Sequence, residues 1–129
     1  MSIPVDLAAL GEALGRHDTA YLLVSGEARP HVVQVSPELV DGVLVAAQPG
    51  RTARRVVVDH PSVSLLLPPR EAGGYSLIID GEGSLDAEGG LQVAPSTAVL
   101  HRAGAHEPQS AASDCGNDCR PLEDATPGS

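Results

Sequence analysis

Residues 42–67 constrain the fold of this chain more than any other stretch. They begin with a β-rich run at 42–47 (GVLVAA) and continue through a Pro-Gly turn at 49–50. An arginine-rich segment follows and stops at His60-Pro61, because proline cannot continue a helix. The apolar run at 63–67 (VSLLL) then predicts another strand. This order predicts a short helix, at about residues 52–60, between two strands.

The N-terminal part of the chain predicts one helix and three strands. Helical spacing of leucines after a possible N-cap at Asp6 predicts a helix over 6–16. Runs of β-branched and apolar residues predict strands at 20–25, 31–36 and 42–47. The segments between these strands, 26–30 and 37–41, are expected to be turns, so that the three strands form an antiparallel meander.

The C-terminal part predicts two more strands. A long run at 75–85 contains Gly81 and Gly83, which predict a bend or bulge at a barrel corner. A turn at Gly89-Gly90 leads to a last strand at 91–100. The predicted fold class is therefore mainly β, a small antiparallel barrel of about six strands with two short helices and an irregular C-terminal tail.

The hydrophobic periodicity ends after Ala103. Residues 104–129 are small, polar, acidic and proline-rich, so we expect a domain at 1–103 and a disordered tail at 104–129. The tail holds both cysteines, whose three-residue spacing differs from the Cys-x2-Cys of zinc ribbons, and we predict no metal site. A metal site or redox pair is the alternative, and it would draw on His101, Arg102, His106, Asp114, Cys115, Asp118 and Cys119.

Composition limits the partners. A net charge of −9 argues against binding to nucleic acid or to an anionic membrane. The chain has no long apolar run and no signal peptide, and we expect a cytoplasmic location. Without phenylalanine or tryptophan, the core must consist of valine, leucine and isoleucine, and a small barrel of this kind gains stability from dimerisation.

The arginines of the central helix indicate a small phosphorylated ligand. Arg51, Arg54 and Arg55 lie within five residues at the start of that helix, although the chain as a whole is acidic. A helix N-terminus offers unpaired N–H groups, and guanidinium groups are multi-donor partners for phosphate. Arg51 and Arg55 are four residues apart and share a helix face. The alternative is that these arginines form an ordinary solvated surface.

The order of these elements and their junctions resembles the pyridoxamine 5′-phosphate oxidase-like split-barrel family, also called the flavin/deazaflavin oxidoreductases. The resemblance covers about residues 7–100. It rests on the strand at 20–24 and on four further segments: 29–33 (RPHVV), 49–56 (PGRTARRV), 60–65 (HPSVSL) and 79–83 (IDGEG).

The resemblance implies a homodimer that binds FMN, or the deazaflavin coenzyme F-420, in a groove at the subunit interface. The cofactor phosphate would lie near the start of the basic helix. Family members commonly have a lysine or arginine where this chain has Thr52. The residues that would contact the cofactor are Arg51, Thr52, Arg54 and Arg55, with Gln48 on a ribityl or phosphate oxygen and the backbone of Val33, Val35 and Ser36 along the ring.

The same resemblance implies an oxidoreductase that transfers hydride to or from a small-molecule substrate. No residue is assigned a catalytic role, because the chain lacks a Ser-His-Asp order, a His-Glu-x-x-His motif and a glycine-rich dinucleotide fingerprint. The chain also lacks the basic C-terminal end of a true pyridoxamine 5′-phosphate oxidase, so vitamin B6 synthesis is not predicted. The alternatives are a non-catalytic flavin or haem carrier or sensor, and a cofactor-free interaction protein.

Overall fold

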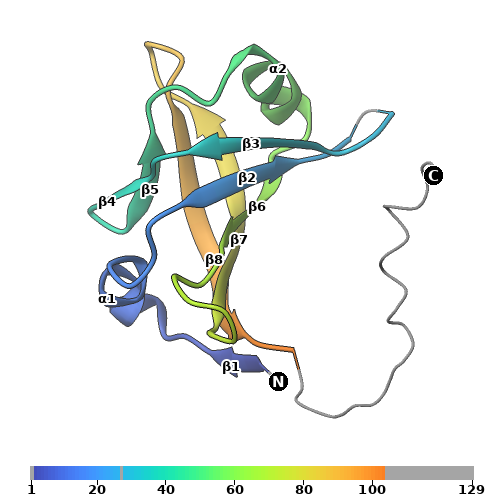
Figure 1. Ribbon diagram of the computed structural model, residues 1–129. Coiled ribbons are helices and arrows are strands. Elements are labelled where there is room, and N and C mark those ends of the chain that lie inside the picture. Colours follow the sequence, from blue (N-terminus) through green and yellow to red (C-terminus); the bar gives the residue numbers. More distant parts are fainter. Residues whose placement is uncertain (1, 27, 104–129) are drawn as a thin grey trace, which may run out of the picture.

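The computed structural model describes residues 2–26 and 28–103, which form one strongly curled antiparallel sheet with helices beside it (Figure 1). The elements are, in chain order, β1 (Ser2–Pro4), the 3-10 helix η1 (Leu7–Ala9), α1 (Leu10–Leu14), β2 (Ala20–Val24), β3 (His31–Val35), β4 (Glu38–Val40), β5 (Val43–Ala46), α2 (Arg51–Asp59), β6 (Ser62–Leu67), β7 (Ser76–Leu85) and β8 (Leu91–His101).

The sheet curls because its two ends are consecutive in the chain. The strand order is β3-β2-β6-β7-β8-β5-β4, and β1 pairs with β8 outside this path. Only Ser36 and Pro37 separate β3 at one end from β4 at the other. If β3 and β4 are counted as one bent strand, the barrel has six strands, and β1 is an extra strand that pairs only with β8. The predicted mainly β, antiparallel barrel with short helices is confirmed.

The prediction for residues 37–41 is wrong. They were expected to be a turn, but Glu38–Val40 is the short strand β4, paired with β5. The turn itself is the pair Asp41 and Gly42, with φ angles of 52° and 81°. Positive φ at both central residues is the geometry of a two-residue hairpin. Consequently β3 pairs with β2 and β5 pairs with β4 and β8, so the expected three-strand meander is not formed.

Aliphatic side chains fill the core, as the composition requires. Strands β2, β6 and β7 alternate between buried and more exposed positions along their length, the pattern of a sheet with one face turned inward. Among the described residues, no polar or charged side chain is buried. The largest fully buried side chains include Leu10, Leu22, Leu44, Leu65, Leu77, Ile79 and Leu91.

Helix α2 packs directly on β7 where that strand has glycines. The helix buries Ala53, Val56 and Val57. A Cβ atom added at Gly83 would lie 2.7 Å from Cγ2 of Val57, so the missing side chain is what permits this approach. One at Gly81 would collide with the carbonyl oxygen of Ala94. The β7–β8 register shifts between Asp80 and Gly81, which confirms the bulge predicted at this glycine.

Neither α1 nor α2 is suited to cross a bilayer. No helix among residues 2–26 and 28–103 is long and apolar enough to do so. The predicted cytoplasmic location is not tested by this finding. The predicted tail at 104–129 lies outside the described residues, together with His106, Asp114, Cys115, Asp118 and Cys119.

We predict that Gly83→Ala destabilises the fold by about 1–3 kcal/mol, because the new methyl group forces α2 away from β7. The matched control is Gly11→Ala in α1, where a Cβ would make an ordinary 3.5 Å contact with Leu39. Removing a helical glycine there should leave stability equal or raise it by about 0.5–1 kcal/mol. Urea unfolding of both variants measures the difference, and equal midpoints would contradict the packing argument.

Candidate functional site

Helix α2 begins with unsatisfied backbone donors. Its N-cap, Gly50, has φ 92° and ψ 160°, and no side chain caps the first turn. The first turn contains no acidic residue. A Cβ at Gly50 would meet no atom within 4 Å, so the space beside the helix start is open. The first N–H groups of α2 and its partial positive charge are therefore available to an anion.

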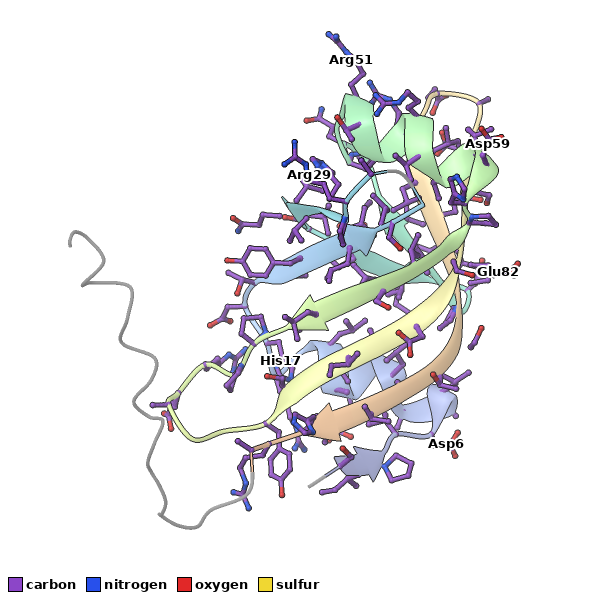
Figure 2. The ribbon with its side chains drawn as sticks, turned by 90° about the vertical axis from the view of Figure 1, so that its right-hand side faces the viewer. Asp6, His17, Arg29, Arg51, Asp59 and Glu82 are labelled. Atoms are coloured by element: carbon purple, nitrogen blue, oxygen red, sulfur yellow. The ribbon has the colours of Figure 1, made fainter. Side chains whose placement is uncertain are left out.

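The predicted phosphate residues differ in their surroundings. Arg51 is exposed and extends away from the body of the protein (Figure 2), and it makes no ion pair or hydrogen bond within the part of the chain that the structure describes. Arg54 is half-buried, and its side chain lies along Gly89 in the β7–β8 turn. Arg55 is exposed and Thr52 is half-buried. Arg51 is thus the guanidinium at the helix start that is most accessible to a ligand.

The chemistry of this region fits a phosphate group. The helix start offers the N–H groups of its first turn, a threonine hydroxyl and guanidinium N–H groups. Gln48, two residues before the N-cap, is exposed and adds an amide. No carboxylate lies in the first turn to compete with an anion. These donors match the requirements of phosphate recognition at a helix N-terminus.

The residues predicted to lie along the ring belong to β3. Val33 packs against the core and Val35 is buried, whereas Ser36, just beyond the strand, is exposed. Val35 can therefore meet a ligand mainly through its backbone, whereas part of the Val33 side chain is also accessible. Because β3 ends the strand order, one of its edges has no partner strand among the described residues. That edge presents the kind of backbone groups that a pyrimidine edge can pair with.

The structure does not bring the two predicted halves of the site into one pocket. Val35 and Ser36 line a hollow of ≈ 170 Å³ with His17, whose Nδ1 lies 3.0 Å from the carbonyl oxygen of Pro68. None of the arginines of α2 lines this hollow. Pockets that enclose a cofactor-sized ligand usually measure about 300–1,000 Å³. In the described part of the chain, the donors at the start of α2 therefore lie outside the hollow beside Val35 and Ser36, and this hollow is too small to enclose a tricyclic ring.

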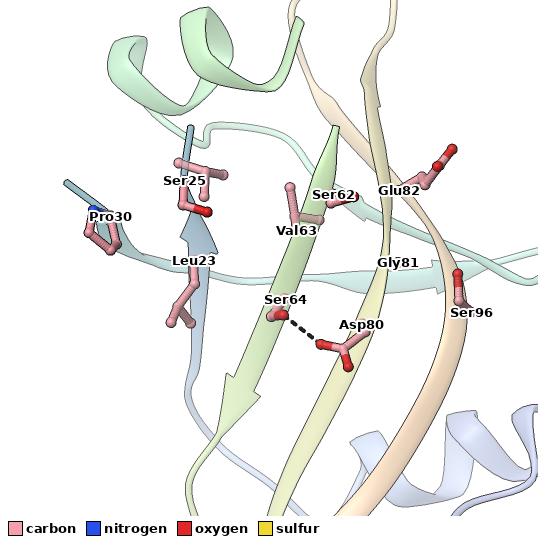
Figure 3. A pocket seen from close by; sticks show the side chains of 11 residues that line it. Leu23, Ser25, Pro30, Ser62, Val63, Ser64, Asp80, Gly81, Glu82 and Ser96 are labelled. Atoms are coloured by element: carbon pink, nitrogen blue, oxygen red, sulfur yellow. Dashed lines mark hydrogen bonds between the residues drawn. The ribbon is translucent and has the colours of Figure 1, made fainter. Parts of the chain in front are cut away.

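A larger groove, which the sequence analysis missed, lies on the outer face of the sheet (Figure 3). We call it the outer groove. It has a volume of ≈ 540 Å³, and inside it the hydroxyl of Ser64 donates to the carboxylate of Asp80 at 2.5 Å. The sequence signal for this groove is a polar residue at every second position of two strands, Ser62 and Ser64 on β6 and Asp80 and Glu82 on β7. The lining residues are Leu23, Val24, Ser25, Pro30, Ser62, Val63, Ser64, Asp80, Gly81, Glu82 and Ser96.

An apolar row crosses the same outer face. Tyr21, Leu66, Ile78 and Val99 are cross-strand neighbours on β2, β6, β7 and β8, and each is half-buried. They occupy the positions that alternate with the buried core residues of β2, β6 and β7, so they face away from the core. We call these four residues the outer apolar row.

We predict that Gly50→Ala costs about 1–3 kcal/mol, because φ 92° is strained for any residue with a Cβ. The control is Gly73→Ala, at φ 83° in the loop before β7, where a Cβ would also meet open space. Both should lower the urea midpoint to a similar extent. Only the first should speed hydrogen exchange of the Arg54 amide, which donates to the carbonyl oxygen of Gly50 at 3.1 Å, and unchanged exchange there in Gly50→Ala would contradict the assigned helix start.

Comparison with known proteins identifies relatives by sequence and neighbours by fold. No family model matches the chain. The uncharacterised protein Mb0449c of Mycobacterium bovis is 38% identical over 132 residues, covering 89% of this chain and 92% of that protein. The uncharacterised protein MT0457 of Mycobacterium tuberculosis matches with the same identity and coverage.

Three solved structures share the fold. A provisionally assigned pyridoxamine 5′-phosphate oxidase of Listeria innocua matches with a TM-score of 0.61 and 15% identity, covering 73% of this chain and 96% of its own. An FAD-binding protein of Mesorhizobium loti matches with a TM-score of 0.57 and 15% identity, covering 78% of this chain and 96% of its own. The FAD-binding protein of Mycobacterium smegmatis matches with a TM-score of 0.56 and 12% identity, covering 79% of this chain and 100% of its own. At these identities the likeness concerns the fold, and it confirms the expected split barrel.

Proposed function

We propose that this chain, which belongs to the same family as the two mycobacterial proteins and has the pyridoxamine 5′-phosphate oxidase-like split-barrel fold, binds a flavin-type cofactor. The observation that carries the proposal is the start of α2. There an exposed Arg51 without a partner in the described part of the chain stands beside uncapped helix N–H groups. This donor set suits the phosphate that such cofactors carry.

FMN is the cofactor we propose first, and the deazaflavin coenzyme F-420 is the alternative. Two structural neighbours are FAD-binding proteins by name, so FAD belongs in the same comparison. A phosphate at the start of α2 serves all three. The contacts we assign are Arg51, Thr52, Arg54 and Gln48 to the phosphate end, with Arg55 beside them, and the backbone of Val33, Val35 and Ser36 to the ring.

We further propose an oxidoreductase that acts on a small-molecule substrate. When bound, the cofactor would supply hydride transfer at its ring. The residues of this chain would bind and orient it: Arg51 and Arg54 fix the phosphate, and the free edge of β3 aligns the ring. No side chain is assigned as a proton donor or acceptor.

Completion of the ring slot by a second copy of the chain is part of the proposal. The hollow beside Val35 and Ser36 is too small to enclose a tricycle, so another surface must cover the ring. The outer apolar row gives a second copy a place to pack, since it is a continuous line of half-exposed aliphatic and aromatic groups. Burial of these side chains also adds stability to a small aliphatic core.

We predict that Arg51→Ala and Arg54→Ala each weaken FMN binding by about 1.5–3 kcal/mol, the loss expected for a charge-assisted hydrogen bond. Fluorescence-quenching titrations with FMN, FAD and the deazaflavin coenzyme measure the effect and select the cofactor. The control is Arg16→Ala, because Arg16 pairs with Glu12 on α1 and lies outside the site. The affinity of Arg16→Ala for FMN should equal that of the wild type.

Two results of these titrations would count against the assignment. Unchanged affinity in both α2 variants would place the phosphate elsewhere. No binding of any of the three cofactors to the wild type would favour a cofactor-free interaction protein. Thermal unfolding of Arg54→Ala separates lost binding from the lost packing of this side chain on Gly89.

We predict that Ile78→Asp keeps the chain monomeric whereas the wild type forms the proposed dimer, because the substitution places a charge in the middle of the outer apolar row. Sedimentation equilibrium of the full chain measures the mass. The matched control is Val40→Asp on β4, which also places an aspartate on an aliphatic surface position (49% exposed) but lies off the row. A wild-type monomer, or dissociation by both substitutions, would contradict the proposed interface.

A further inference from the structure

The outer groove has the size and the mixed lining of a small-molecule site. Its ≈ 540 Å³ falls within the range of about 300–1,000 Å³ that such pockets occupy. Leu23 and Pro30 contribute apolar surface on the side of β2 and β3. Four serine hydroxyls and two carboxylates supply the polar groups (Figure 3). A ligand there would meet both hydrocarbon and hydrogen-bonding partners.

The two carboxylates in the groove have no counter-ion among residues 2–26 and 28–103. Asp80 and Glu82 are the charged lining residues, and no arginine or histidine lines the groove. Asp80 accepts a hydrogen bond from Ser64, and within the part of the chain that the structure describes neither carboxylate pairs with a cation. Two uncompensated negative charges beside an apolar wall attract a cation.

The register of β6 and β7 repeats one chemical unit twice. Ser64 lies opposite Asp80, and Ser62 lies opposite Glu82. Residues two apart on a strand share a face and are separated by about 7 Å. An ammonium group carries three N–H donors, so one ammonium can satisfy a carboxylate and the hydroxyl across from it. The groove thus offers two ammonium positions about 7 Å apart, with apolar surface nearby.

We propose that the outer groove binds linear organic diamines, with one ammonium on each serine–carboxylate pair and the hydrocarbon chain against Leu23 and Pro30. A single metal ion is a poorer match, because no group of three or more His, Cys, Asp or Glu side chains in the described residues could hold one. The inference goes beyond the cofactor proposal, because the groove contains none of the residues assigned to the cofactor. Leu23, Ser64 and Asp80 lie two positions along their strands from residues of the outer apolar row, so the diamine site adjoins the proposed interface between copies.

The test is calorimetric titration of the full chain, without flavin, with 1,4-diaminobutane. We expect it to bind roughly threefold to tenfold more tightly than 1-aminobutane, since the second ammonium adds one charge-assisted contact at an exposed site. Raising the salt concentration should weaken the diamine more than the monoamine. Equal affinity for the two amines, or tighter binding of magnesium chloride than of the diamine, would overturn the proposal.

A pair of double variants locates the site. Asp80→Asn with Glu82→Gln should abolish the preference for the diamine while keeping the shape of both side chains. Glu38→Gln with Glu88→Gln removes the same charge from two exposed residues outside the groove, and should bind the diamine like the wild type. Equal affinity of the first variant and the wild type, or equal loss in both variants, would overturn the assignment. FMN titrations of the same variants report on the cofactor site separately.

Discussion

The contact between α2 and β7 is the constraint on which the other features depend. Val57 reaches the sheet because Gly83 has no side chain, and this contact fixes the rotation of the helix about its axis. With Ala53, Val56 and Val57 buried, the helix must expose Arg51 and Arg55. The position of the proposed phosphate donors is therefore set by core packing, with no polar interaction needed to orient them.

The same contact separates the charges of the molecule. Arginines gather on α2, while the carboxylates of Asp80 and Glu82 lie on the outer face of β7, the strand that carries the helix. Inward-facing glycines and outward-facing acids alternate along this strand. One ten-residue strand thus supports a cationic helix through its inner face and an anionic groove on its outer face.

Sequence patterns predicted the elements better than their assembly. The limits of α2 were predicted to within one residue, because Gly50 and Pro61 mark them. Strands β1 and β4 were missed, because three residues are too few to show a period of two. The alternating polar residues of β6 and β7 mark their strands but not the outer groove, because the groove joins segments from Leu23 to Ser96. Their meeting depends on strand order and register, which local patterns do not specify.

The joint at Ser36 and Pro37 has a consequence for the curled shape of the sheet. These two residues tether the terminal strands β3 and β4, so closure of the barrel involves almost no additional loop entropy. A circular permutation opened at this joint would leave the same hydrogen-bond partners but release both terminal strands from each other. The edges of β3 and β4 that have no partner strand among the described residues would then lie at the two ends of an open ribbon, where they are templates for intermolecular β-pairing.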